Sequence, residues 1–305
     1  MLDTNSINII HNVDIKSGLM LLPDESIDCV ITSPPYYGLR DYGNVNQIGL
    51  ELTPELYIIS LVNVFMDIKR VMKKTATLWI NIGDSYAGSG CGTNDYRTEK
   101  SRSINKSDKM FTKKPPHQKL GKSKNISNAK ESIFIDTEYL KPKDLIGIPW
   151  MLAFSLRNAG FFLRMDNIWS KPNPMPESVK DRPTKAHEYL FLFSKSKEYY
   201  YDYKSIQTNS EYTGVANKKS VWTVPTKPFR DAHFAVFPEN LIMDCIKAGC
   251  PENGVVLDPF LGSGTTAIVS KRLNRNFIGY DINSDYCKIA ERRIHDEIEK
   301  TSLFN

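Results

Sequence analysis

The sequence predicts an α/β fold built on a mostly parallel sheet, and two stretches of the chain carry this prediction. In the N-terminal half, a β-branched strand pattern at 28–32 precedes a helical pattern at 53–74 and a further strand pattern at 75–83. In the C-terminal half, an apolar strand and a glycine loop at 254–266 lead through a helix to a strand that ends at Asp281. Strand, helix and strand in this order favour parallel pairing, because the crossover helix returns the chain to the same end of the sheet.

The N-terminal elements have clear local signals. Residues 7–11 are predicted as a short strand, followed by Asp14 and by a helical turn at 16–22. Thr53 can serve as the N-cap of the long helix, with Pro54 in its first turn, and apolar residues then keep helical spacing through the segment. The N-terminal half thus supplies a strand–helix–strand unit after one short strand.

The composition is that of a soluble globular protein with a mildly basic charge. The 305 residues are 41% hydrophobic and 25% charged, with a formal net charge of +5, which permits a nucleic-acid partner without demonstrating one. No stretch approaches the ~20 apolar residues that a membrane helix needs, and the N-terminus has no signal-peptide pattern. Five scattered cysteines and five histidines lack metal-ligand spacing, so we expect reduced thiols, no metal site and a cytoplasmic location.

The middle of the chain changes character twice. No apolar periodicity is sustained from residue 88 to about residue 130, and between residues 97 and 124 ten basic residues accompany two acidic ones. We predict a flexible insert here, whose basic side chains can order against phosphates. Beyond it, 144–159 is predicted as a helix that ends at Gly160, followed by aromatic-rich strands at 161–170 and 188–194. The segment between these strands is too proline-rich for a crossover helix, so they are predicted as antiparallel neighbours.

Residues 33–36, with the sequence Ser-Pro-Pro-Tyr, stop the strand at 28–32. Two prolines cannot donate to a sheet ladder, so the chain must leave the sheet and form a rigid loop at the carboxyl end of the strand. Open α/β sheets bind their ligands at this end. The Ser33 hydroxyl and the freed carbonyls can accept hydrogen bonds from an amino group, and the Tyr36 ring can stack on a planar ring. A nucleobase with an exocyclic amine offers both, whereas the alternative is a turn that merely ends a strand.

The glycine loop at 254–266 provides a second candidate site. Gly262 and Gly264 allow a tight turn and the close approach of a ligand, and the N-terminus of the helix at 266–273 presents free N–H groups. Asp281 ends the next strand, where its carboxylate can accept both hydroxyls of a ribose. The glycine spacing also fits the dinucleotide fingerprint of an NAD-dependent oxidoreductase. However, only about 40 residues follow the loop, too few for a dinucleotide domain in its usual order.

The two motifs together resemble those of the amino-methyltransferases that modify DNA bases. Ser33-Pro34-Pro35-Tyr36 resembles motif IV of that family, in which the tetrapeptide is Asp/Asn/Ser-Pro-Pro-Tyr/Phe. Asp258-Pro259-Phe260-x-Gly262-x-Gly264 resembles motif I, His233-Phe234-Ala235-x-Phe237-Pro238 resembles motif X, and 169–195 resembles motifs VII and VIII. Motif IV preceding motif I is the permuted order of the family's β group.

This resemblance implies a SAM-dependent methyltransferase (Rossmann-like) fold, with a mostly parallel sheet, an antiparallel edge hairpin and a circularly permuted motif order. It implies S-adenosyl-L-methionine (SAM) as the cofactor. The catalytic residues that it implies are Ser33, Pro34, Pro35 and Tyr36. The cofactor-binding residues that it implies are Asp14, His233, Phe234, Phe237, Asp258, Pro259, Phe260, Gly262, Gly264, Thr265 and Asp281.

The implied reaction is methyl transfer to an exocyclic base nitrogen of duplex DNA. Hydrogen bonds from the amine to the Ser33 hydroxyl and the Pro34 carbonyl would localise the nitrogen lone pair, and the flipped base would stack on Tyr36. Within the family, Ser at the first motif position favours cytosine N4, with adenine N6 as the alternative. The absence of a Pro-Cys motif argues against cytosine C5 chemistry. An enzyme acting on RNA or on protein glutamine, and a non-catalytic DNA-binding relative, are the further alternatives.

The expected organisation has five parts. They are a catalytic half of the core at 1–87, the basic insert at 88–140, a continuation of the core with the hairpin at 141–197, a target-recognition segment at 198–225 and the SAM-binding half at 226–305. The expected partners are double-stranded DNA and, in a restriction-modification system, a cognate endonuclease. A nucleoid-associated monomer or homodimer without membrane contact is expected, and which of the two central segments reads bases is left open.

Overall fold

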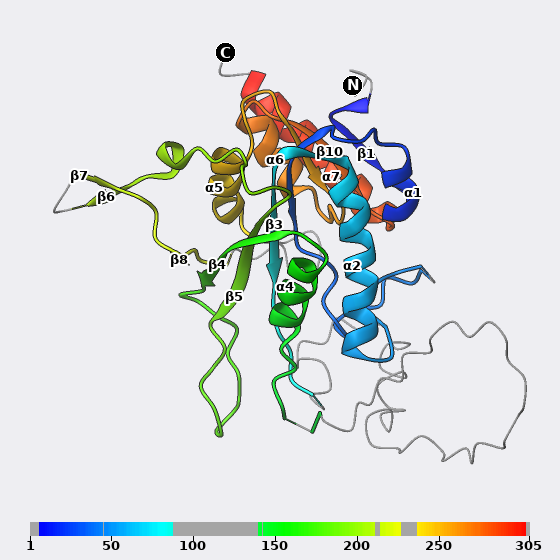
Figure 1. Ribbon diagram of the computed structural model, residues 1–305, viewed down its shortest axis with the longest axis vertical. Coiled ribbons are helices and arrows are strands. Elements are labelled where there is room, and N and C mark those ends of the chain that lie inside the picture. Colours follow the sequence, from blue (N-terminus) through cyan, green and yellow to red (C-terminus); the bar gives the residue numbers. More distant parts are fainter. Residues whose placement is uncertain are drawn as a thin grey trace, which may run out of the picture.

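The body of the protein is a twisted sheet with helices on both faces, as the computed structural model in Figure 1 shows. The structure describes residues 6–44, 46–87, 140–141, 143–210, 214–226 and 237–302. Nearly all of the predicted basic insert, and the predicted motif X residues His233 and Phe234, lie outside these described residues.

The main sheet contains eight strands in the order β1-β10-β9-β2-β3-β5-β4-β8 among the described residues. The strands are β1 (Ile9–His11), β2 (Ile27–Thr32), β3 (Met72–Ile82), β4 (Phe162–Ser170), β5 (His187–Ser194), β8 (Val221–Thr223), β9 (Val255–Asp258) and β10 (Asn276–Tyr280). The first five strands of that order are parallel, and β5 is antiparallel to both β3 and β4. The predicted mostly parallel sheet and antiparallel strand pair are therefore confirmed.

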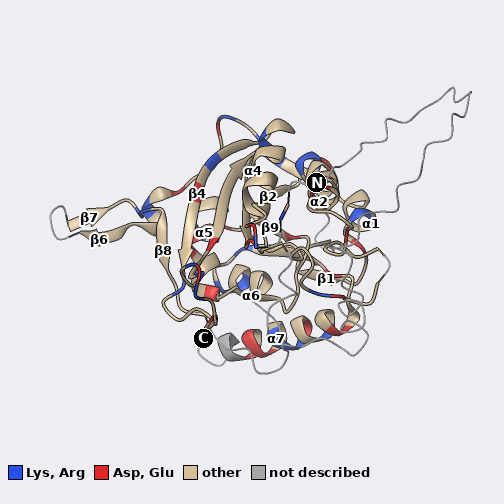
Figure 2. Cartoon of the chain, turned by 90° about the horizontal axis from the view of Figure 1, so that it is seen from below, with Lys and Arg blue, Asp and Glu red and all other residues tan. Residues whose placement is uncertain are grey.

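Helices enclose this sheet in a three-layer arrangement (Figure 2). They are α1 (Ile15–Met20), α2 (Pro54–Val71), α4 (Ile148–Asn158), α5 (Glu239–Gly249), α6 (Thr265–Arg272) and α7 (Ser284–Ser302). Side chains of α1, α2 and α4 share one core with the face of β2 that carries Val30. Side chains of α5 and α6 share a second core with the opposite face, which carries Cys29 and Ile31. Both faces of the central strands are buried, which explains their continuous apolar sequences.

The pairing of β2 with β9 joins the two halves of the chain. Val30 lies opposite Leu257 in a parallel register, although 227 positions separate them in the sequence. The carboxyl ends of these two strands therefore lie side by side. Each strand continues into one of the two predicted motifs, so this pairing decides where the candidate site forms.

Two predicted helices have different limits in the structure. Helix α2 begins after its predicted N-cap Thr53 but ends at Val71, because Met72 has an extended backbone and the chain enters β3 directly. The helix predicted at 144–159 begins only at Ile148. Gly147 precedes it in a left-handed conformation, and the Asp84 carboxylate accepts hydrogen bonds of 3.0 Å from the backbone N–H groups of Gly147 and Ile148. A cap supplied from 63 residues away leaves no local sequence signal.

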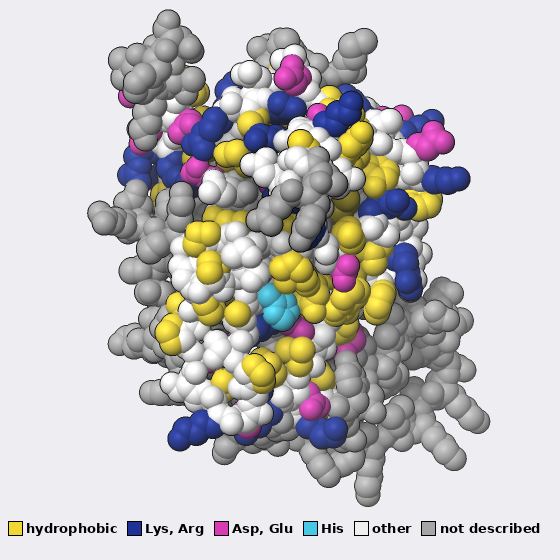
Figure 3. Space-filling model, turned by 90° about the vertical axis from the view of Figure 1, so that its left-hand side faces the viewer, with side chains coloured by type: hydrophobic (Ala, Val, Ile, Leu, Met, Phe, Trp, Pro, Cys, Tyr) yellow, Lys and Arg dark blue, Asp and Glu magenta, His cyan; other side chains and the backbone are white. Residues whose placement is uncertain are grey.

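Several elements were not predicted from the sequence. Two of them, helices α5 and α7, belong to the C-terminal half of the chain. A third, β8, extends the sheet beyond the antiparallel pair by pairing parallel with β4. A 3₁₀ helix (Tyr203–Ile206) and the ribbon of β6 (Thr208–Ser210) and β7 (Gly214–Ala216) precede β8, and the ribbon projects from the body (Figure 2). Figure 3 views the molecule from this side, where hydrophobic and uncharged side chains occupy much of the middle and Lys and Arg gather nearer the margins. None of the helices in the described part of the chain is long and apolar enough to cross a membrane.

Candidate active site

A cavity of about 730 Å³ opens at the carboxyl ends of β2, β9 and β10. Its lining comes from both predicted motifs. Ser33, Pro34, Pro35 and Tyr36 line it from the loop after β2, and Pro259, Phe260, Gly262, Thr265 and Asp281 line it from the other half. Asp14 and Phe237 also line it. The structure thus places eleven of the thirteen predicted site residues that it describes around one cavity.

Asp258 and Gly264 are the two described residues of that set that do not line the cavity. The Asp258 side chain is only 1% exposed and lies behind the glycine loop. Its carboxylate accepts hydrogen bonds from the Thr266 hydroxyl at 2.6 Å and from the Phe260 backbone N–H at 3.1 Å. Burial raises the pKa of Asp258 to about 6, against the opposing effect of these hydrogen bonds. Through these hydrogen bonds the buried carboxyl group stabilises the conformation of the glycine loop.

The two glycines of the loop have different physical reasons to be glycine. Both have positive φ angles, 54° at Gly262 and 85° at Gly264, which side chains with a Cβ adopt at a cost. A Cβ at Gly264 would lie 2.7 Å from the Cβ of Ala290 on α7, so this position is set by helix packing. A Cβ at Gly262 would have no heavy atom within 4 Å, and this residue lines the cavity. The absence of a side chain at Gly262 therefore leaves space for a ligand next to the loop backbone.

Asp281 connects the glycine loop to the end of β10. One oxygen of its carboxylate accepts from the Gly262 backbone N–H at 2.8 Å, and the other accepts from the Asn283 N–H at 2.8 Å. Burial raises the pKa of Asp281 above the ordinary value of a carboxyl group. The same carboxylate lines the cavity, where its remaining lone pairs can accept hydrogen bonds from hydroxyl groups of a ligand.

Arg293, which was not predicted, and Asp14, which was, complete this side of the site. The Arg293 guanidinium on α7 donates to the Ser263 hydroxyl at 2.9 Å and so ties the glycine loop to the last helix. Asp14 serves as the N-cap of α1, accepting from the backbone N–H groups of Lys16 at 3.1 Å and Ser17 at 3.2 Å. The Ser17 side chain and these backbone bonds lower the pKa of Asp14. Its carboxylate is thus an acceptor at the rim of the cavity.

The Ser-Pro-Pro-Tyr loop is fixed by two tyrosine hydroxyls. The Tyr57 hydroxyl of α2 donates to the Pro35 carbonyl at 2.7 Å, and the Tyr36 hydroxyl donates to the Glu188 carboxylate of β5 at 2.6 Å. Ser33 is half-buried at the cavity wall, and its side chain lies within hydrogen-bonding reach of the Tyr36 hydroxyl. Burial, and after it the Glu188 carboxylate, raises the pKa of Tyr36 well above its ordinary value, so the phenol stays protonated and can donate. These two hydrogen bonds restrain the loop on both sides of its prolines.

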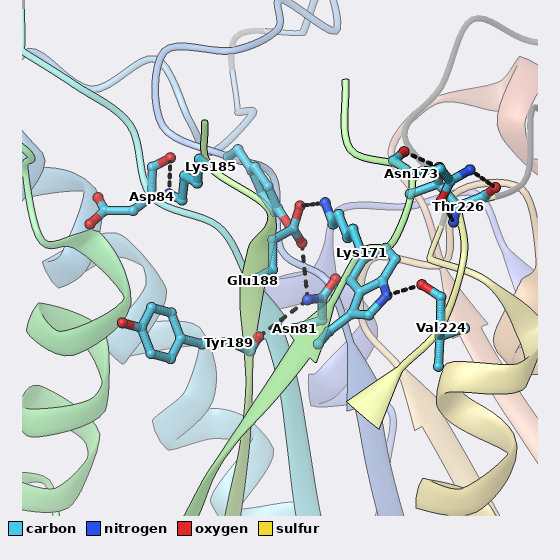
Figure 4. A network of polar contacts seen from close by, with 11 residues as sticks. Asn81, Asp84, Lys171, Asn173, Lys185, Glu188, Tyr189, Val224 and Thr226 are labelled. Carbon is cyan, nitrogen blue, oxygen red and sulfur yellow. Dashed lines mark hydrogen bonds and ion pairs between the residues drawn. The ribbon is translucent and has the colours of Figure 1, made fainter. Parts of the chain in front are cut away.

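Sequence reasoning did not single out several polar residues that line the cavity. Asn81 of β3, Lys171 directly after β4 and Glu188 of β5 do so (Figure 4). Trp169 of β4 lines the cavity beside them. Lys171 and Glu188 fall inside the segment that resembles motifs VII and VIII, but the resemblance identified no individual residue there. Their clustering depends on the antiparallel pairing of β4 with β5, in which Trp169 lies opposite Glu188.

Comparison with known proteins shows which family the chain resembles. The N6/N4 family model described as DNA methylase matches residues 27–292. The Type II methyltransferase M.SmaI of Serratia marcescens is 44% identical over 283 residues, covering 92% of this chain and 88% of the relative. The Type II methyltransferase M.Cfr9I of Citrobacter freundii is 45% identical over 285 residues, covering 93% and 86%.

Solved structures share the fold at low sequence identity. The cytosine-N4-specific PvuII DNA methyltransferase superposes with a TM-score of 0.65 at 18% identity, covering 95% of this chain and 91% of that one. TTHA0409 of Thermus thermophilus, a proposed DNA modification methylase solved in complex with S-adenosyl-L-methionine, superposes with a TM-score of 0.60 at 19% identity, covering 95% of each chain. The predicted methyltransferase fold is confirmed. With the family model spanning most of its length and full-length relatives at 44–45% identity, the chain belongs to the N6/N4 family of DNA methylases.

Proposed function

We propose that this DNA methyltransferase transfers a methyl group from SAM to the exocyclic N4 of cytosine in duplex DNA. The observation that carries the proposal is that Ser33, from the loop after β2, and Asp281, after β10, line one cavity. An acceptor for an amine and an acceptor for a ribose thus share one space, although they come from opposite ends of the sequence. Adenine N6 is the alternative acceptor.

The chemistry of the cavity fits SAM. When bound, SAM supplies an electrophilic methyl group on a sulfonium sulfur. The Asp281 carboxylate is suited to accept from ribose hydroxyls, and the Phe260 side chain offers an apolar surface at the same wall. Gly262 leaves the neighbouring space free of a side chain. A cavity of about 730 Å³ is also of the size typical of cofactor sites.

The loop after β2 would hold the acceptor base. An exocyclic amine conjugated to its ring is a poor nucleophile, and hydrogen bonds from its N–H groups to the Ser33 hydroxyl and the Pro34 carbonyl favour a localised lone pair. Most of the rate enhancement then comes from positioning, which the rigid loop provides. To reach a cavity of this kind the base must leave the duplex at a cost of a few kcal/mol, which stacking on Tyr36 offsets.

The choice of cytosine rests on Ser33, which occupies the first position of the Ser-Pro-Pro-Tyr motif. In this family Ser at that position favours cytosine N4, and Asp favours adenine N6. Reading of the surrounding sequence is assigned to 198–225, which includes the projecting β6–β7 ribbon (Figure 2), and to the basic insert predicted at 88–140. A cognate endonuclease remains an expectation from the sequence.

The test is incorporation of labelled methyl from SAM into DNA purified from a methylation-free host. Digestion of the product to nucleosides and mass spectrometry will distinguish the acceptors. We expect N4-methylcytosine, with transfer lost in Ser33→Ala and Asp281→Ala. N6-methyladenine would overturn the assignment of the base and retain the reaction class. Tight DNA binding without any transfer would indicate a non-catalytic protein and would contradict the proposal.

A further inference from the structure

The Tyr36 hydroxyl belongs to a polar network that the reaction described above does not use. The Glu188 carboxylate accepts from Tyr36 at 2.6 Å and from the Asn81 amide at 3.1 Å through one oxygen. Its other oxygen forms an ion pair with the Lys171 ammonium (Figure 4). The Asn81 amide also donates to the Tyr189 carbonyl at 3.2 Å, which anchors the network on the backbone of β5.

The ion pair in this network is largely removed from water. The side chains of Lys171 and Glu188 are only 18% and 15% exposed, and the Lys171 ammonium lies 4.3 Å from the centre of the Trp169 ring. Such a pair is weak evidence for stability, because desolvation of both charges offsets most of their attraction. A role in orienting a neighbour explains its presence better.

The neighbour that it orients is the aromatic ring of Tyr36. A Cβ placed at Gly83 would lie 2.9 Å from Cε2 of that ring and 3.4 Å from Cδ of Glu188, so the backbone after β3 packs directly against both side chains. The ring is thus held at its edge by Gly83 and at its hydroxyl by Glu188. Both constraints come from the protein itself.

We propose that Glu188, held by Lys171 and Asn81, is a positioning residue that fixes the Tyr36 ring for stacking on the acceptor base. This inference rests on the proposed function, since it assumes that the base enters beside Tyr36. Glu188 acts here through the acceptor oxygen that it presents, and its negative charge serves to hold Lys171. The carboxylate does not take a proton from the amine.

The experiment compares two paired variants that both remove the ion pair. Lys171→Met/Glu188→Leu removes the acceptor that Glu188 offers the Tyr36 hydroxyl, whereas Lys171→Met/Glu188→Gln keeps one amide oxygen in its place. Replacing both members of a buried pair avoids leaving an unpaired charge, so both variants should fold. Each is made with Tyr36 and with Tyr36→Phe, and kcat, KM for DNA and the Kd for SAM are measured on DNA from a methylation-free host.

We expect kcat to fall about tenfold in the Leu pair and to stay within about threefold of wild type in the Gln pair, at unchanged Kd for SAM. In the Tyr36→Phe background, the Leu pair should cause no further loss, because the hydroxyl through which Glu188 acts is absent. Losses that add across the two backgrounds would overturn the inference and indicate direct contact of Lys171 or Glu188 with DNA. Equal, deep losses in the Leu and Gln pairs would also overturn it and point to the charge itself. A wild-type protein that transfers no methyl group would instead refute the proposed function.

Discussion

The contrast between the two glycines of the cofactor loop gives the sharpest prediction about stability. In Gly264→Ala the new methyl group meets Ala290 at 2.7 Å and its Cα at 3.0 Å, on a helix that cannot move without disturbing the core beneath α6 and α7. In Gly262→Ala the new methyl group meets nothing within 4 Å. The two variants therefore share the backbone cost and differ in the steric cost.

The magnitudes follow from these distances. A left-handed backbone costs a residue with a Cβ about 1–2 kcal/mol, and this applies to both variants. Overpacking against an unyielding neighbour adds about 1–3 kcal/mol, which applies to Gly264→Ala alone. We expect the free energy of unfolding to fall by about 3 kcal/mol in Gly264→Ala and by about 1.5 kcal/mol in Gly262→Ala.

Urea denaturation of both variants measures this difference, and calorimetric titration with SAM supplies the second readout. Because Gly262 lines the cavity, its substitution should weaken SAM binding by at least tenfold, an effect out of proportion to its small loss of stability. Gly264→Ala should bind SAM nearly normally when measured well below its unfolding temperature. Equal losses of stability in the two variants, or a greater loss in Gly262→Ala, would refute the packing argument.

Three further predictions follow from the site. Burial raises the pKa of Asp281, so its carboxylate is protonated at a higher pH than an ordinary carboxyl. SAM affinity should therefore fall as the pH is lowered through the raised pKa of Asp281, because the protonated carboxyl group accepts hydrogen bonds less well. Calorimetry of Asp281→Asn should show a weak affinity that does not change with pH. Asp258 has a pKa of about 6 in the folded protein against 3.8 for an unperturbed side chain, so the folded state binds the extra proton between these values. The free energy of unfolding should decline as pH rises from 4 to 6, and denaturant titrations of Asp258→Asn should lack this part of the decline. Tyr57→Phe removes the hydrogen bond to the Pro35 carbonyl. It should cost about 1 kcal/mol of stability and lower kcat with unchanged SAM affinity, whereas a wild-type kcat would show that this bond does not hold the loop.

The fold and the meeting of the two motifs could be predicted because their signals are local. Pro34 and Pro35 end β2 by removing donors, and Gly262 and Gly264 mark a turn after β9, whatever surrounds them. Two such loops after buried parallel strands are directed to the same edge of a sheet. The pairing of β2 with β9 then brings them to one cavity, as the permuted motif order predicts.

The residues that support the site could not be predicted in the same way, because their partners are distant in the sequence. Glu188 contacts Tyr36 across 152 positions, and Tyr57 contacts Pro35 from a different layer. Asp258 was predicted to bind the cofactor, but in the structure it lies behind the loop. A motif identifies which residues occur together, whereas only the packing shows which of them face the cavity.

The central claim is that one cavity brings the acceptor amine and the methyl donor together between loops from opposite ends of the chain. A crystal structure of the protein with bound SAM tests it most directly. We expect the ribose hydroxyls to lie on the Asp281 carboxylate and the sulfonium methyl group to face the Ser33 hydroxyl and the Pro34 carbonyl. SAM bound elsewhere, or bound with its methyl group directed away from Ser33, would contradict the account.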